Sequence, residues 1–236
     1  MILRRFIKHV SEQNWFAVGI DVLVVILGVY IGVYLSNLSE ERSKQKDIIE
    51  AINLIEKQLL ADLENLEYII DYRTNKLSEN FIGIEELNKT TPNMEVASNA
   101  IYKTFRRNYT FFPNSSGYSG IKERGFLPYL KDAKLELTMS NLFDRIYVRH
   151  TVIADENDDY SFNYNLNFIR VYLDFKNKKF IGDPVIASAR LRGALEQMHS
   201  NSEWYIQFLK ETVLPELRLT LDAIDKFQAE SAIFQG

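Results

Sequence analysis

The sequence predicts an all-α protein in which an N-terminal amphipathic helix and a transmembrane helix precede an antiparallel helical bundle. The 21 residues from Trp15 to Leu35 contain one charged side chain, apolar residues recur every three or four positions along much of the remaining chain, and Gly and Pro are concentrated in residues 107–131. Apolar residues at this spacing favour amphipathic helices, whereas Gly and Pro mark loops. We therefore expect three parts: residues 1–14, residues 15–36, and a bundle over 37–236 with an irregular segment.

The first part is expected to form a helix that lies on the membrane surface. Its apolar side chains recur at helical spacing with cations between them: Ile2, Leu3, Phe6, Ile7 and Val10 against Arg4, Arg5 and Lys8. A helix of this kind buries its apolar face in the bilayer interface and places its cations near anionic headgroups. The lipid bilayer is therefore the first predicted partner.

The second part is expected to cross the membrane. At about 1.5 Å per residue its apolar run spans about 30 Å, the thickness of a hydrocarbon core. A cleaved signal peptide is the alternative, but its apolar core has about 7 to 15 residues and ends at a small-residue cleavage site. Here the longer run continues into Ser36 and Asn37, so we predict an uncleaved anchor. Basic residues before and after it are nearly balanced, and we favour an N-terminus on the cytoplasmic side.

Within this span, Asp21, Gly28 and Gly32 fall on one side of the helix, because residues seven and four apart lie nearly above one another. Glycines let helices approach closely, and an acidic group in a span avoids lipid. We interpret this face as a self-association surface, with Asp21 facing a partner helix or a hydrated lumen. The alternatives are that the glycine spacing is incidental and Asp21 reaches the headgroups, or that Asp21 lines an ion or proton path.

One long amphipathic helix is predicted after the span. Its apolar positions are Ile48, Ile52, Ile55, Leu59, Leu63, Leu66 and Ile70, and charges such as Glu56, Lys57, Asp62 and Glu64 are expected on its other faces. No Gly or Pro interrupts residues 33–82, so this helix is expected to continue from the span. A coiled-coil stalk would show a similar pattern, but later segments supply bundle partners, and we favour the bundle.

The next segments are also expected to be mainly helical. Thr91 and Pro92 predict the start of a helix with Ala97, Ala100, Ile101 and Phe105 on its buried face. A further helix is predicted over 135–147, followed by an acidic turn at Asp155–Asp159 and a helix over 160–175, where an initial alternation would also suit a strand.

A last long helix is predicted to start at Asp183 and Pro184 and to continue almost to the C-terminus. Pro215 is expected to kink it. Its predicted buried positions are Ile206, Leu209, Val213, Leu217, Leu221, Ile224 and Phe227.

The composition argues against most catalytic and metal-binding chemistry. Cysteine is absent, and the three histidines, His9, His150 and His199, lie far apart in the chain, so we predict no metal and no cofactor. No phosphate-binding, dinucleotide, hydrolase or calcium-loop motif is present, and we predict no enzymatic activity. The formal net charge of −4 implies no strongly basic face, so nucleic acid is not an expected partner.

The best candidate for a recognition surface is the stretch from Arg106 to Arg124. Arg106, Arg107 and Tyr109 combine guanidinium groups with an aromatic ring, and Lys122 and Arg124 follow a short way on. Guanidinium groups bind carboxylates and phosphates, and rings offer stacking surfaces, so the loop could recognise an anionic ligand or a protein partner. The alternative is a structural loop whose aromatics seal the bundle and whose arginines pair with nearby acids.

Two stretches resemble a family. The residues from Phe16 to Asp21, the run with Gly28 and Gly32, and Asn37-Leu38-Ser39-Glu40, together with the Ser119–Leu135 stretch, are similar to an uncharacterised family of bacterial single-span membrane proteins, a domain of unknown function. Leu38 and Ser39 stand where that family has Trp and Asn. The resemblance implies a bacterial membrane protein and no particular activity. With the N-terminus on the cytoplasmic side, the large domain is expected in the periplasm, anchored in the inner membrane.

Three hypotheses follow. The leading one is a non-enzymatic, membrane-anchored assembly or interaction protein that forms homo-oligomers through its span. The second is a sensory or anion-binding domain, and the third is an oligomeric ion or proton pathway lined by Asp21.

Overall fold

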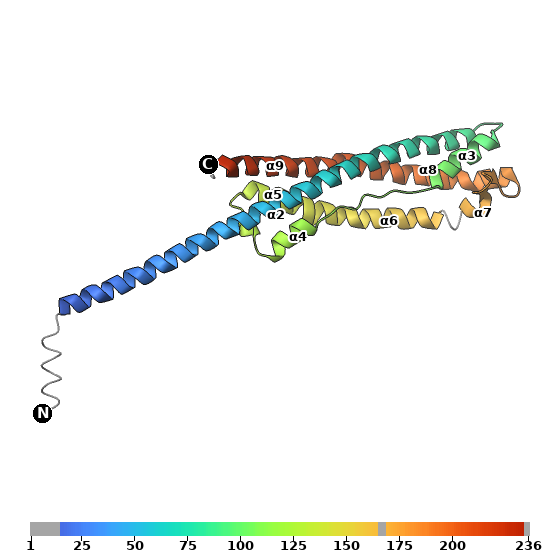
Figure 1. Ribbon diagram of the computed structural model, residues 1–236. Coiled ribbons are helices and arrows are strands. Elements are labelled where there is room, and N and C mark those ends of the chain that lie inside the picture. The colour runs from blue at the N-terminus through green and yellow to red at the C-terminus, as the bar shows by residue number, and fades with distance from the viewer. Residues whose placement is uncertain (1–14, 165–168, 234–236) are drawn as a thin grey trace, which may run out of the picture. The chain divides into compact units, whose positions relative to one another are not determined.

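The computed structural model describes residues 15–164 and 169–233 (Figure 1). The predicted surface helix, residues 1–14, lies outside the described residues. The chain divides between Ile49 and Glu50 into two units. The description below therefore takes the N-terminal unit and the helical domain, residues 50–236, separately.

The described N-terminal unit is the first part of one long helix, α2 (Trp15–Leu87). Its large apolar side chains from Ile20 to Leu35 are between 47% and 69% exposed. The helix is long and apolar enough to cross a membrane, and none of its most apolar stretch is buried in the protein. A helix that is apolar on all sides and unburied by its own chain fits the predicted membrane anchor.

The helical domain confirms the all-α class. After α2 come α3 (Met94–Phe105), α4 (Ser116–Glu123), the 3-10 turn η1 (Leu127–Tyr129), α5 (Ala133–Ser140), the π-helix η2 (Asn141–Tyr147), α6 (Val148–Tyr164), α7 (Arg170–Tyr172), the strands β1 (Leu173–Asp174) and β2 (Lys179–Phe180), α8 (Pro184–Phe208), the π-helix η4 (Leu209–Val213) and α9 (Leu214–Ile233). Within the domain, α6 packs against α8, and α8 with α9 returns in the opposite direction (Figure 1).

The segment predicted to be irregular is only partly so. Residues 107–115 are extended, but α4 and η1 follow inside the predicted loop. The first turn of α4 lies close against α2: Gly117 N–H donates to Gln58 Oε1 at 3.0 Å, and Gln58 Nε2 donates to Ser116 Oγ at 2.9 Å. A Cβ on Gly117 would lie 2.9 Å from Ile55 Cγ1. Gly117 therefore permits a close helix contact and does not mark a loop.

Two predicted starts have different outcomes. Asp183 caps α8 as expected, since its carboxylate accepts from Val185 N–H at 2.8 Å and Pro184 occupies the first turn. The start of α3 was placed too early, because Asn93 and not Thr91 is the cap. The Asn93 side chain accepts from the backbone N–H groups of Glu95 and Val96 at 3.1 and 3.2 Å. Asn is among the strongest capping residues, which explains the later start.

The acidic turn predicted at Asp155–Asp159 is wrong, because these residues lie inside α6. The helix over 160–175 is wrong in its last part: after α7, Leu173 pairs with Phe180 in an antiparallel hairpin. The Asp174 carboxylate accepts from the N–H groups of Lys176 and Asn177 at 2.9 and 3.1 Å, and Lys178 has φ +54°. Local bonds of this kind favour a turn over a helix.

The helix around Pro215 widens into a π-helix just before the proline. The π-helix η4 ends two residues before it, and α8, η4 and α9 follow one another without a loop. Proline removes an N–H group and crowds the preceding turn, and a widened π turn relieves that conflict. The seven predicted buried positions of this last helix are all buried.

The buried positions of α2 differ from the prediction in one informative way. Ile52, Ile55, Leu59 and Leu66 are buried as expected, but Leu63 is half-buried and Asp62, expected on an outer face, is 6% exposed. The buried and half-buried positions that recur every three and four residues include four polar side chains, of which that of Lys76 is half-buried. We call this set the α2 stripe: Ile52, Ile55, Leu59, Asp62, Leu66, Ile69, Arg73, Lys76, Asn80, Gly83 and Leu87.

Candidate functional site

The polar residues of the α2 stripe hold the loop that follows α3. Tyr72 Oη donates to the Arg107 carbonyl oxygen at 3.1 Å, and Lys76 Nζ donates to the same oxygen. One turn of α2 also supplies Arg73 Nε, which donates to the Tyr109 carbonyl oxygen at 2.7 Å. Three side chains from a single helix therefore fix the backbone of residues 107–109.

Arg73 is a buried cation, 3% exposed, and each of its other two guanidinium nitrogens also donates a hydrogen bond. Nη1 donates to Asn157 Oδ1 at 3.0 Å and Nη2 to Thr110 Oγ1 at 2.9 Å, while Cζ lies 4.4 Å from the centre of the Tyr205 ring. Burial lowers the pKa of Arg73, and the charges of Tyr205 and Asp158 oppose that shift. A buried charge is tolerated only when paired in this way, so the cluster joins α2, α6 and α8.

The cluster continues to a buried histidine. His150 is fully buried on α6, and its Nε2 lies 2.9 Å from Tyr205 Oη. Burial, followed by the charge of Arg73, lowers the pKa of His150 to about 4. The ring is therefore neutral at pH 7 and stacks against Phe208. This histidine is a packing residue.

A cavity of about 440 Å³ opens beside this cluster. Its lining consists of Lys76, Thr104, Phe105, Arg106, Arg107, Asn108, Asp158, Asp159, Ser161, Phe162 and Met198. The Lys76 amine is half-buried, and burial together with the neighbouring Arg73 charge lowers its pKa to about 7, an effect that Asp158 opposes. Asp158 is already engaged, because it accepts from Thr110 Oγ1 at 2.5 Å and from Asn108 Nδ2 at 3.1 Å.

The predicted recognition residues separate into two groups. Arg106 and Arg107 line the cavity, whereas Lys122 pairs with Asp144 at 2.9 Å and Arg124 is the exposed C-cap of α4. Lys122 and Arg124 therefore do not belong to the cavity that Arg106 and Arg107 line.

Tyr109 plays a packing role: its ring centre lies 4.7 Å from that of Tyr72 and 6.2 Å from that of Tyr68. The sequence reading missed Lys76 and Arg73. Arg73 follows the buried Ile69 by four residues and Lys76 follows Arg73 by three, and this helical spacing could have indicated that both face the bundle.

Asp62 forms a second buried polar centre on the α2 stripe. Its carboxylate accepts from Asn114 N–H at 3.0 Å and from Tyr147 Oη at 3.1 Å. Burial raises the pKa of Asp62 to about 6, and the two hydrogen bonds oppose the shift. The pKa of Tyr147 is raised as well, by burial and by the charge of Asp62. This centre joins α2 to the π-helix η2 and to the extended segment.

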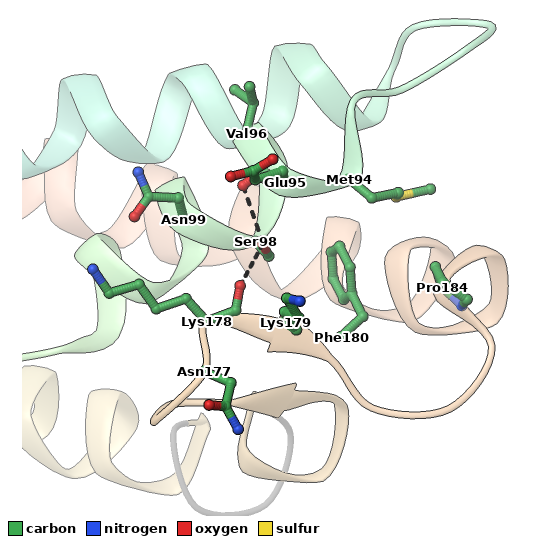
Figure 2. A pocket seen from close by; sticks show the side chains of 10 residues that line it. All are labelled: Met94, Glu95, Val96, Ser98, Asn99, Asn177, Lys178, Lys179, Phe180 and Pro184. Carbon is green, nitrogen blue, oxygen red and sulfur yellow. Dashed lines mark hydrogen bonds between the residues drawn. The ribbon is translucent and has the colours of Figure 1, made fainter.

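A larger cavity of the domain, about 720 Å³, lies elsewhere. Figure 2 shows its lining from α3, the hairpin and the start of α8: Met94, Glu95, Val96, Ser98, Asn99, Asn177, Lys178, Lys179, Phe180 and Pro184. Ser98 Oγ donates to the Lys178 carbonyl oxygen at 2.7 Å, which fixes the hairpin turn on α3. The Lys178 amine lies 4.8 Å from the centre of the Tyr102 ring. This hollow joins a hairpin to its supporting helix, and it contains none of the predicted recognition residues.

The predicted association face lies in the N-terminal unit. A Cβ on Gly28 or on Gly32 would meet no atom within 4 Å. Asp21 belongs to the same helix, but its side chain lies outside the described part. Over the described residues, no group of three or more His, Asp or Glu side chains is arranged to hold a metal ion.

Comparison with known proteins identifies a family. The sequence profile of a family of unknown function, DUF6090, matches residues 21–174. The chain belongs to DUF6090. The match begins inside the apolar part of α2 and ends at the β1 strand, so it includes both the span and the loop of Arg106 and Arg107. No curated protein and no solved structure matches this DUF6090 chain.

Proposed function

We propose that the protein is a non-enzymatic, membrane-anchored assembly module that forms homo-oligomers through the Asp21, Gly28 and Gly32 face. Family membership and a helix able to span a membrane fit a membrane-anchored helical protein. The proposal adds self-association, the absence of catalysis, and a bacterial inner membrane with the domain in the periplasm.

The observation that carries the proposal is the open surface of the span. The helix buries none of its most apolar stretch against its own chain, and both glycines have free space above them. In lipid, helices associate through close packing at small residues, and a carboxyl group in a span is stabilised by a partner helix or by water. A second copy of the same helix would supply both contacts.

The proposed lack of catalysis rests on the chemistry of the domain. His150, the natural candidate for a general base, is fully buried, held by Tyr205 and neutral. A general base must reach the proton that it removes, which this position prevents.

The mass of the full-length protein in native lipid nanodiscs, measured by native mass spectrometry, tests self-association. We expect a defined oligomer that Gly28→Leu combined with Gly32→Leu converts to monomer. The matched control is Ile26→Leu combined with Tyr30→Leu, which places two leucines on the opposite face of the same helix. A monomeric wild type, or an oligomer that survives the glycine changes, would overturn the proposal.

A further inference from the structure

Two arginines, Arg106 and Arg107, line the cavity beside Lys76, and among the described residues their side chains do not contribute to the contacts that stabilise the fold. In the part of the chain that the structure describes, neither Arg106 nor Arg107 makes a side-chain hydrogen bond or ion pair. The loop is held through its backbone carbonyls by Tyr72, Arg73 and Lys76. Both guanidinium groups are thus available, and the backbone carbonyl of Arg107 is held in place.

The charges around the cavity leave a positive excess. Arg106 and Arg107 line it together with Lys76, whose pKa is lowered to about 7, and two carboxylates, and the buried cation Arg73 lies beside it. Asp158 is engaged by Thr110 and Asn108, and Arg73 Nη2 lies 3.9 Å from its Oδ1. Asp159 is therefore the one carboxylate of the lining that opposes the cations without such partners among the described residues.

The rest of the lining contains both apolar and polar side chains. Phe105, Phe162 and Met198 supply apolar surface, and Thr104 and Ser161 supply hydroxyl groups. The volume of about 440 Å³ lies within the range of small-molecule sites. Guanidinium groups bind carboxylates and phosphates in paired geometry, which a fixed backbone favours by reducing the entropy lost on binding.

We propose that this cavity binds a small molecule that carries a carboxylate or phosphate group on an apolar body. Arg106 and Arg107 bind the anionic group, Lys76 of the lining is a further donor, and Phe162 with Met198 contacts the apolar part. The site lies wholly within residues 50–236 and does not depend on the proposed self-association.

Binding of phenyl phosphate and of benzoate to the full-length protein in zwitterionic nanodiscs tests the proposal, with calorimetry as the readout and benzyl alcohol as the uncharged ligand control. We expect at least one of the two anions to bind and benzyl alcohol not to bind. Replacing Arg106→Gln and Arg107→Gln together is expected to weaken binding by about tenfold or more, because charge-assisted hydrogen bonds are lost.

Arg124→Gln is the matched control, since it removes the same charge from an exposed position outside the cavity. We expect it to leave the affinity unchanged and all variants to keep the wild-type melting temperature, because neither Arg106 nor Arg107 holds a described contact. Absence of binding by both anions, equal binding of benzyl alcohol, or an equal loss in Arg124→Gln would overturn the proposal.

Discussion

The two parts of α2 use the same backbone in opposite ways. From Ile20 to Leu35 the helix is apolar on every side and exposed, whereas beyond Glu50 it buries a single stripe and leaves charges on the rest. A helix in lipid needs apolar side chains all round, and a helix in a bundle needs them on one face. The helical backbone is the same in both parts of α2, so the distribution of apolar and charged side chains around the helix follows from the surrounding medium.

The difference extends to polar residues. For the one carboxyl group of the span, that of Asp21, we propose a partner in a second copy of the chain. In the domain, Asp62 and Arg73 occupy buried stripe positions and the same chain satisfies them. The domain thus supplies the partners of these two charged residues itself, and we propose that the span is the part that associates.

The largest expected effect is at Arg73, where the domain buries a charge. Arg73→Met should lower the free energy of unfolding by about 3 to 5 kcal/mol, because Thr110, Asn157 and the Tyr109 carbonyl lose their partner. Urea unfolding of the full-length protein in micelles measures it. The control is Arg218→Met, whose exposed pair with Glu67 should contribute about 1 kcal/mol or less. Equal losses would show that burial does not distinguish the two arginines.

The next effect is a pH dependence at Asp62. Because the folded pKa is raised to about 6 from the ordinary 3.8, the folded state binds a proton more readily than the unfolded state between these values. The stability of wild type relative to Asp62→Asn should therefore rise as the pH falls through about 6. This rise should be complete below about pH 4. We expect a gain of roughly 2 kcal/mol, allowing for solvent screening.

Unfolding of both proteins from pH 7 to 4 checks this sign. The His150 contribution has the opposite direction, since its folded pKa is lowered, but it is common to both proteins and cancels in their difference. A difference that stays constant over this window would contradict the buried-carboxyl assignment.

A smaller effect is expected where α4 meets α2. Gly117→Ala places a Cβ 2.5 Å from Gln58 Oε1 and 2.9 Å from Ile55 Cγ1, and such overpacking should cost about 1 to 3 kcal/mol. Gly120→Ala in the same helix meets no atom within 4 Å and should be neutral or stabilising by up to about 1 kcal/mol. Melting temperatures of the two variants test this difference. A lower melting temperature for Gly120→Ala alone would contradict it.

The smallest effect on the domain is expected from the span. Gly28→Ala should leave the unfolding free energy of the helical domain unchanged, because no atom lies within 4 Å of the new Cβ. Its consequence should appear in oligomer mass alone. A change in domain unfolding at constant oligomeric state would show that the two units are more strongly coupled than their separate packing indicates.

The sequence by itself determined the features that depend on composition and near neighbours. The span followed from the length of its apolar run, the start of α8 from Asp183 and Pro184, and the buried face of α9 from spacings of three and four. Each depends on residues a few positions apart, so a single sequence is sufficient.

Only the tertiary structure decided which charges are buried. Asp62 and Arg73 continue the α2 stripe, but an apolar pattern alone favours Leu63, which is only half-buried, over Asp62. The acidic run of α6 likewise favours a turn from sequence alone, whereas in the structure Arg73 donates to Asn157 of α6 and to Thr110. These partners lie 84 and 37 residues from Arg73 in the chain. A buried charge is stable only with such distant partners, so folding, and not local spacing, brings Lys76 to Arg106 and Arg107.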